Sequence, residues 1–170
     1  MTATTTSPSV ERDSEALHDR MEIMELTSKL LLSVDAREWA AAEELFTDRV
    51  DVDYTSLNGG QPQTVSPAAL IGGWRQTLDH LEATQHLQGN HVIAFDRDEA
   101  SCATNVQATH VLPNATGGPI WTVGGRYDFR LTRTPSGWRI AAMTLTVKWA
   151  TGNQRIMELA ASKGSATPTD

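Results

Sequence analysis

The strongest constraint on the fold lies in the second half of the chain, which reads as a run of long strands. Four segments are rich in alternating apolar and β-branched residues, and turn-like sequences separate them. The segments span residues 86–95, 101–112, 120–134 and 138–150, and the turns between them are DRDEA, PNATGG and PSG. Because short turns join antiparallel neighbours, this half predicts four long antiparallel strands, followed by a short helix over 153–160.

The first half of the chain predicts helices instead. Over residues 12–34 the apolar side chains recur at helical spacing. The face that we expect to be buried is formed by Leu17, Met21, Met24, Ser28, Leu31 and Asp35, and it is widened by Ile23, Leu30 and Val34. We expect a second helix over 38–46, a short strand over 50–54, a loop at 58–60, and a third helix that runs to about residue 81. Ser66 as N-cap and Pro67 at the first turn mark the start of that third helix.

Helices gathered on one side of an antiparallel sheet make an α+β fold. We expect a cone-shaped α+β barrel, in which the N-terminal helices pack on a strongly curved, mainly antiparallel sheet with a pocket at its mouth. Gly89, Gly124 and Gly125 are candidates for the bends that curve the sheet. The length of 170 residues favours one domain, over 11–161, with disordered tails at 1–10 and 162–170 that are rich in Ser, Thr and Pro.

The composition of the chain limits which classes of molecule we expect the protein to bind. The formal net charge is −7 and no cluster of Lys or Arg occurs, which argues against nucleic acid. The first residues carry neither a basic nor an apolar signal region, and no apolar run approaches the length of a membrane span, so we expect a cytoplasmic protein. Cys102 is the single cysteine of the sequence, so neither an intrachain disulfide nor a cysteine-based zinc site can form.

Three ionisable residues occur where the hydrophobic pattern asks for apolar ones. Asp35 closes the helical stripe, His110 lies on the more apolar face of its strand, and His86 falls at a strand start. A buried carboxylate is costly unless it is paired, and histidine is its natural partner. An imidazole oriented by a carboxylate is the smallest set of side chains that can transfer a proton near neutral pH. We therefore expect Asp35 and His110 to form a hydrogen-bonded pair inside a pocket.

Other uses of these residues are less favoured. Strict alternation places His86 and His91 on opposite faces, so at most one of them is expected to point inward. Tyr54 ends the short strand and could place its hydroxyl in the pocket or simply pack. The His and Asp spacing matches no metal motif, so we expect no bound metal. Taken singly, Asp35 could also face water and His110 could be an ordinary core histidine.

At these residues the chain resembles the scytalone dehydratases, and more broadly the SnoaL-like group of the nuclear-transport-factor-2-like superfamily. The resemblance covers about residues 12–150. It rests on the order and spacing of D-x-x-x-W from Asp35, V-D-Y ending at Tyr54, T-Q-H ending at His86, His110, and V-K-W ending at Trp149.

The resemblance implies a deep apolar pocket and catalysis without a metal or organic cofactor. It implies that Asp35 and His110 act together as the base, that His86 assists loss of the hydroxyl, and that Tyr54 holds a water on the substrate carbonyl. Three polar positions of the dehydratase pattern are changed: the tyrosine just before the aspartate is replaced by Val34, and the Ser and Asn of the third long strand are missing or replaced near Gly125 and Tyr127.

We therefore predict a dehydratase, a carbon–oxygen lyase, that acts on a cyclic, mostly apolar hydroxy-ketone such as a polyketide or steroid-like metabolite. An isomerase or cyclase of the same fold, or a binding module without chemistry, remain as alternatives. The expected substrate contacts are Val34, Tyr127, Trp121, Trp74 and Trp149. The polar outer face of the sheet predicts a homo-oligomer, and the resemblance favours a trimer.

Overall fold

The computed structural model describes residues 8–114 and 117–165. Its helices are α1 (Pro8–Ala36), α2 (Trp39–Glu43), α3 (Thr55–Asn58), α4 (Pro67–Leu78) and α5 (Arg155–Ser165). Its strands are β1 (Phe46–Asp53), β2 (Gln63–Val65), β3 (Ala83–Asp96), β4 (Glu99–Val111), β5 (Ile120–Thr134) and β6 (Gly137–Gly152). The four long strands and the two long helices were predicted, whereas α3 and β2 were not.

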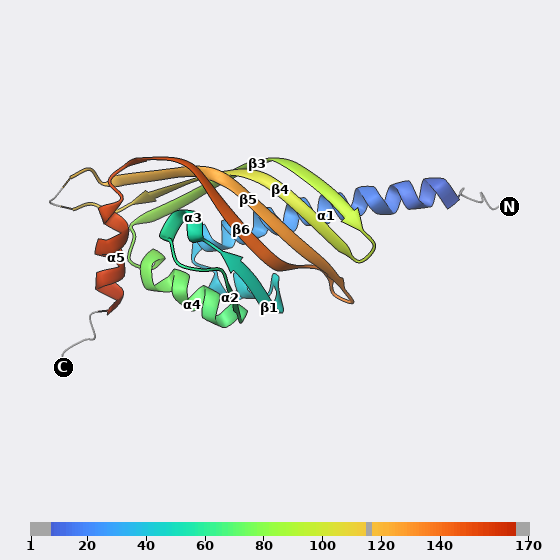
Figure 1. The fold of residues 1–170 in the computed structure, drawn as a ribbon, viewed down its shortest axis with the longest axis horizontal. Coiled ribbons are helices and arrows are strands. Elements are labelled where there is room, and N and C mark those ends of the chain that lie inside the picture. The colour runs from blue at the N-terminus through green and yellow to red at the C-terminus, as the bar shows by residue number, and fades with distance from the viewer. Residues whose placement is uncertain (1–7, 115–116, 166–170) are drawn as a thin grey trace.

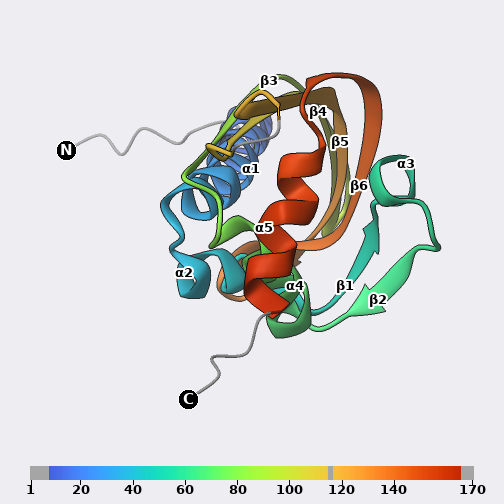
Figure 2. The ribbon, with the colours of Figure 1, turned by 90° about the vertical axis from the view of Figure 1, so that its left-hand side faces the viewer.

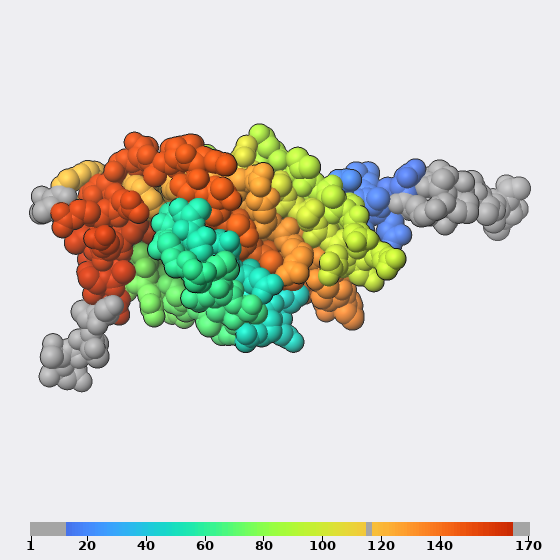
Figure 3. Space-filling view, in the orientation of Figure 1, coloured from blue at the N-terminus to red at the C-terminus, as the bar shows by residue number. Residues whose placement is uncertain are grey.

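The strands form one six-stranded sheet in the order β2-β1-β6-β5-β4-β3. Consecutive long strands pair antiparallel, and β1 joins β6 in parallel. The sheet curves around α1, and α4 and α5 close one end of the molecule (Figures 1 and 2). The β3–β4 turn and the described start of α1 lie at the opposite end (Figure 3). This arrangement confirms the expected α+β cone.

The long helix α1 buries only part of the face that its sequence predicted. Leu17 and Met21, which were expected on the buried face, are 60% and 63% exposed, whereas Leu31 and the residues expected to widen that face, Ile23, Leu30 and Val34, are buried as predicted. Polar residues share the buried face because they find partners there. The Asp19 carboxylate accepts hydrogen bonds from the Arg133 guanidinium and from the indole of Trp138, so a carboxylate replaces the apolar residue that the stripe required.

The sheet bends where register shifts interrupt its pairing. One shift lies between Gly89 and Val92 on β3, and another lies at Gly124 and Gly125 on β5. These are the three glycines that were expected to curve the sheet. The first bulge also exchanges the two faces of β3, because Gln88 and His91 hydrogen-bond to one another on the side of α1. The prediction that His86 and His91 lie on opposite faces was therefore wrong.

The element boundaries differ from the predicted ones at several places. The second helix stops at Glu43 and Phe46 already starts β1, so the expected helix over 38–46 is shorter. Helix α1 begins at Pro8 and α5 reaches Ser165, so each extends into a stretch that was expected to be a tail. The rest of those tails lies outside the described residues. No helix in the described part of the chain is long and apolar enough to cross a membrane.

Candidate active site

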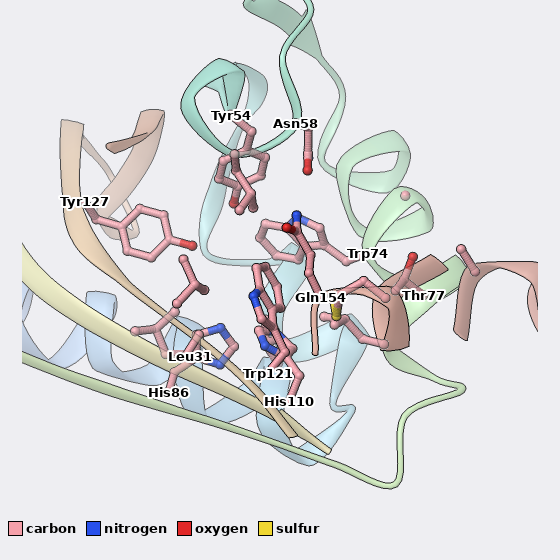
Figure 4. Close-up of a pocket in the computed structure, with 18 of the residues that line it drawn as sticks. Leu31, Tyr54, Asn58, Trp74, Thr77, His86, His110, Trp121, Tyr127 and Gln154 are labelled. Carbon is pink, nitrogen blue, oxygen red and sulfur yellow. The ribbon is translucent and has the colours of Figure 1, made fainter. Parts of the chain in front are cut away.

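A cavity of about 540 Å³ lies between the concave face of the sheet and helices α1, α3, α4 and α5. Its inner wall is mostly apolar, and a few polar groups converge on it (Figure 4). Strands β3, β4 and β5 contribute His86, His110, Trp121 and Tyr127, while Tyr54 and Trp74 face them from the other side. A pocket of this kind is suited to a small, largely apolar molecule.

The central polar contact of the site joins Asp35 to His86. The Nδ1 atom of His86 lies 2.7 Å from Asp35 Oδ1, and the backbone N–H of His86 donates to Asp35 Oδ2, also at 2.7 Å. Burial raises the pKa of the Asp35 carboxyl, but the hydrogen bonds and charge of His86 outweigh burial and hold it below its ordinary value. Ionised Asp35 therefore keeps a proton on Nδ1 of neutral His86 and leaves Nε2 to accept one.

The expected pair of Asp35 with His110 is therefore wrong: the partner of Asp35 is His86. The reason is the strand order. Strand β3 is the edge strand and packs on α1, so the free N–H of His86 and its side chain both reach the end of that helix. His110 lies one strand further in, on β4, where its cross-strand neighbours are Thr84 and Trp121.

His110 lies beside this pair as a second, more deeply buried imidazole. Its ring stacks on Trp121, with centroids 5.2 Å apart, and meets the His86 ring edge-on at 6.1 Å. It is 5% exposed, and its Nδ1 atom has no hydrogen-bond partner among the described residues. Burial, and then the neighbouring His86, lower the pKa of His110 to about 4. At neutral pH His110 is an uncharged imidazole.

Two phenols line the cavity with the histidines: Tyr127 lies on the same sheet, and Tyr54 lies on the opposite side. Tyr54 directly follows β1, and its hydroxyl contacts Met143 Sδ at 3.7 Å. Desolvation raises the pKa of Tyr54 well above its ordinary value, and neighbouring Tyr127 raises it further. Desolvation also raises the pKa of Tyr127. Both hydroxyls therefore stay protonated and can donate hydrogen bonds to a ligand.

Most of the predicted contact residues line the cavity. Val34, Trp74, Trp121 and Tyr127 are among its lining side chains. Trp149 is not, because an extra residue in β6 at Lys148 turns its side chain to the convex face of the sheet. There the indole packs over Gly124 and is 48% exposed. The proposed contact between Trp149 and substrate was therefore wrong.

Sequence reasoning missed the part of the cavity that the last helix provides. Gln154, Met157 and Glu158 line it from α5 and its start, and Asn58 and Thr77 add polar groups from α3 and α4. The sequence predicted α5, but nothing in its pattern indicated that the helix returns to the cavity. The structure contains no group of three or more His, Cys, Asp or Glu side chains that could hold a metal, as far as residues 8–114 and 117–165 are concerned.

The chain matches known proteins along most of its length. Residues 15–144 match the model of the SnoaL-like domain. An uncharacterized protein of Mycobacterium tuberculosis is 28% identical over 125 residues, which cover 73% of this chain and 82% of that protein.

Solved structures give the same result for the fold. The Kfla4162 protein of Kribbella flavida is 31% identical with a TM-score of 0.80, over 84% of this chain and 99% of that one. A candidate scytalone dehydratase from Novosphingobium aromaticivorans is 18% identical with a TM-score of 0.72, over 84% and 92%. A hexachlorocyclohexane dehydrochlorinase, LinA type 2, is 17% identical with a TM-score of 0.71, over 83% and 93%. With its matching domain model, its curved sheet and its helix-closed cavity, this chain belongs to the SnoaL-like family of the nuclear-transport-factor-2-like superfamily.

Proposed function

We propose that the protein is a cofactor-independent lyase that removes water from a cyclic, mostly apolar hydroxy-ketone. The observation that carries this proposal is the Asp35–His86 pair, a carboxylate with two 2.7 Å contacts to one histidine at the wall of an apolar cavity. Such a pair provides an oriented base without any metal or cofactor. The proposal assigns the role of base to His86, where the sequence had suggested His110.

The proposed reaction moves one proton and breaks one carbon–oxygen bond. His86 Nε2 takes the proton α to the substrate carbonyl, and the resulting cation is stabilised by Asp35. The electron pair of the broken C–H bond forms an enolate, which the protonated phenols of Tyr54 and Tyr127 stabilise by donating hydrogen bonds, directly or through water. The enolate re-forms the carbonyl and expels the hydroxyl, which receives the proton from His86 and departs as water.

His110 is proposed to assist as a neutral hydrogen-bonding group. Because its pKa is lowered, the His110 ring is uncharged at neutral pH and has no second proton to donate as an acid. It can still orient a substrate oxygen by hydrogen bonding, because a neutral imidazole has one donor and one acceptor. The expelled hydroxyl therefore takes its proton from His86 rather than from His110.

The structural neighbours support an elimination reaction. One is named as a dehydrochlorinase and one as a candidate dehydratase, and both names describe loss of a small molecule from a substrate. Isomerisation or ring closure would use the same base and is the alternative within enzymes. The apolar residues at Val34 and Gly125, where the dehydratase pattern has polar ones, favour a binding module as the alternative outside enzymes.

A mass-spectrometric screen for loss of water tests the proposal. Wild-type protein and the variant His86→Gln are incubated with a panel of cyclic hydroxy-ketones after exhaustive chelation of metals. We expect at least one compound to lose water with the wild type, and the rate to fall by roughly 10²–10⁴-fold in the variant. Products of unchanged mass would indicate isomerisation. Tight binding without any product, at full occupancy, would indicate a binding module and contradict the proposal.

A further inference from the structure

Arg37, the residue that directly follows α1, has a left-handed backbone conformation that is unfavourable for a residue with a side chain. The N–H of Arg37 bonds to the carbonyl of Val34 at 3.2 Å, and that of Glu38 bonds to the carbonyl of Ser33 at 2.8 Å. This is the hydrogen-bond pattern of a Schellman motif, in which the residue after the helix adopts the left-handed conformation. Arg37 has a φ of +61°. Glycine would adopt this conformation without strain, so the arginine side chain is retained at a cost in free energy.

The guanidinium of Arg37 hydrogen-bonds to the backbone of Asp35 and to the neighbouring strand β3. Its Nη1 atom donates to the backbone carbonyl of Asp35 and to the hydroxyl of Thr84, both at 2.9 Å. Its Nη2 atom approaches the carbonyl of Leu81 at 3.5 Å. One half-buried cation therefore ties the end of α1 to the start of β3, the two elements that carry Asp35 and His86.

Thr84 connects this cation to the active site. A hydroxyl has one proton to donate and accepts through its lone pairs. Because Arg37 donates to the Thr84 oxygen, the Thr84 proton is free to bond to the Asp35 carboxylate, and that bond helps to lower the pKa of Asp35. Thr84 is also the cross-strand partner of His110, so the guanidinium charge lies close enough to His110 to lower its pKa further.

We infer that Arg37 is a positioning residue of the active site, which acts through Thr84 to fix the Asp35 carboxylate against His86. The inference rests on the proposed function, because it gives Arg37 its importance through the Asp35–His86 base. This inference predicts that the Arg37 guanidinium is needed for catalysis, although Arg37 lines no part of the cavity. His86 and Thr84 from β3 hydrogen-bond to the Asp35 carboxylate, Arg37 bonds to the Asp35 backbone carbonyl from the helix end, and His110 on β4 lies close enough for its pKa to respond to the Asp35 charge.

Substitution by glycine separates this role from a structural one. Arg37→Gly relieves the left-handed backbone and removes the guanidinium, so the melting temperature should stay within a few degrees of the wild type. Arg97→Gly is the matched control, because Arg97 also has a positive φ, of +55°, and lies in the turn between β3 and β4, away from the cavity. Thr84→Val is the second variant, and it removes the relay while it keeps the shape of the side chain.

The first readout needs no substrate. The titration of the Asp35 carboxyl carbon by ¹³C NMR should shift to higher pH in Arg37→Gly and in Thr84→Val, and should not shift in Arg97→Gly. The second readout is turnover. We expect kcat to fall between about tenfold and 100-fold in the first two variants, with KM within about twofold of the wild type.

Two outcomes would overturn the inference. One is an unchanged Asp35 titration in Arg37→Gly and Thr84→Val, and the other is a kcat equal to that of Arg97→Gly. Failure of the proposed function is distinct, because it would show as full activity of the His86→Gln variant.

Discussion

Two imidazoles share one cavity, and their surroundings give them different chemical states. His86 is hydrogen-bonded through Nδ1 to the carboxylate of Asp35, which orients its ring. His110 is 5% exposed and lies against Trp121, so desolvation opposes its protonation. The site thus contains one histidine that a carboxylate orients and one that burial keeps uncharged.

The lowered pKa of His110 makes the stability of the fold depend on pH. Its pKa is about 4 in the folded protein and about 6.5 in the unfolded chain. As pH falls below about 6.5, the unfolded state binds a proton that the folded state does not, so stability declines until pH reaches about 4. Urea unfolding of the wild type and of His110→Phe, at pH 7 and pH 4.5, measures this contribution. We expect the wild type to lose up to roughly 3 kcal/mol more than the variant. Equal losses of stability in the wild type and in His110→Phe would contradict the lowered pKa of His110.

Single residues also show what sequence patterns can resolve. Asp35, His86 and His110 were recognisable because ionisable side chains interrupted apolar faces, and the structure brings all three together. The partner of Asp35 was not recognisable, because it depends on which strand is the edge strand beside α1. Arg37 gave no signal at all, since a left-handed backbone after a helix is expected of glycine.

At the scale of elements, bulges decide which side chains reach the cavity. Alternation placed His110 correctly on the apolar face of β4, which the structure buries. It failed for His91 after the bulge in β3 and for Trp149 after the extra residue in β6. Each bulge shifts the two-residue period by one, so every side chain beyond it changes face. The glycines in the sequence indicated where these register shifts lie, but they did not indicate which strand carries the extra residue at each shift.

The two adjacent glycines of β5 should respond differently to substitution. A Cβ atom at Gly125 would lie 2.4 Å from the backbone oxygen of Thr146, whereas one at Gly124 would lie 2.2 Å from the indole of Trp149. Backbone cannot yield, but a half-exposed side chain can. We expect Gly125→Ala to destabilise by roughly 1–3 kcal/mol in any background. The cost of Gly124→Ala should largely vanish when Trp149 is also replaced by alanine, in a double-mutant cycle of denaturant unfolding. Equal costs of Gly124→Ala in both backgrounds would contradict the contact.

At the scale of the whole molecule, the helices within residues 8–114 and 117–165 leave the convex face of the sheet uncovered (Figure 1). A row of cross-strand neighbours crosses it from Leu87 through Gln107 and Gly124 to Trp149. Leu87 and Trp149 are 59% and 48% exposed, and Val92 on the same face is 69% exposed. Exposed apolar side chains gathered on one flat face favour contact with another protein surface.

We therefore predict a homo-oligomer that packs through this face, with a trimer favoured. Light scattering at micromolar concentration should give a multiple of the 18.5 kDa chain mass. The variant Leu87→Asp should reduce the mass to that of one chain, because it places a charge in the contact. The variant Leu17→Asp, on the exposed side of α1, is the control and should leave the mass unchanged. A wild-type mass near 18.5 kDa would contradict the prediction.

The most direct test of the account is the turnover of Asp35→Asn on a compound that the wild type dehydrates. The amide can keep the shape of the side chain, but it no longer enforces the tautomer of His86 or stabilises its cation. We predict that kcat falls by roughly 10²–10⁴-fold, while the melting temperature shows that the fold is retained. Turnover at the wild-type rate by a folded Asp35→Asn protein would show that the Asp35–His86 pair is not the base.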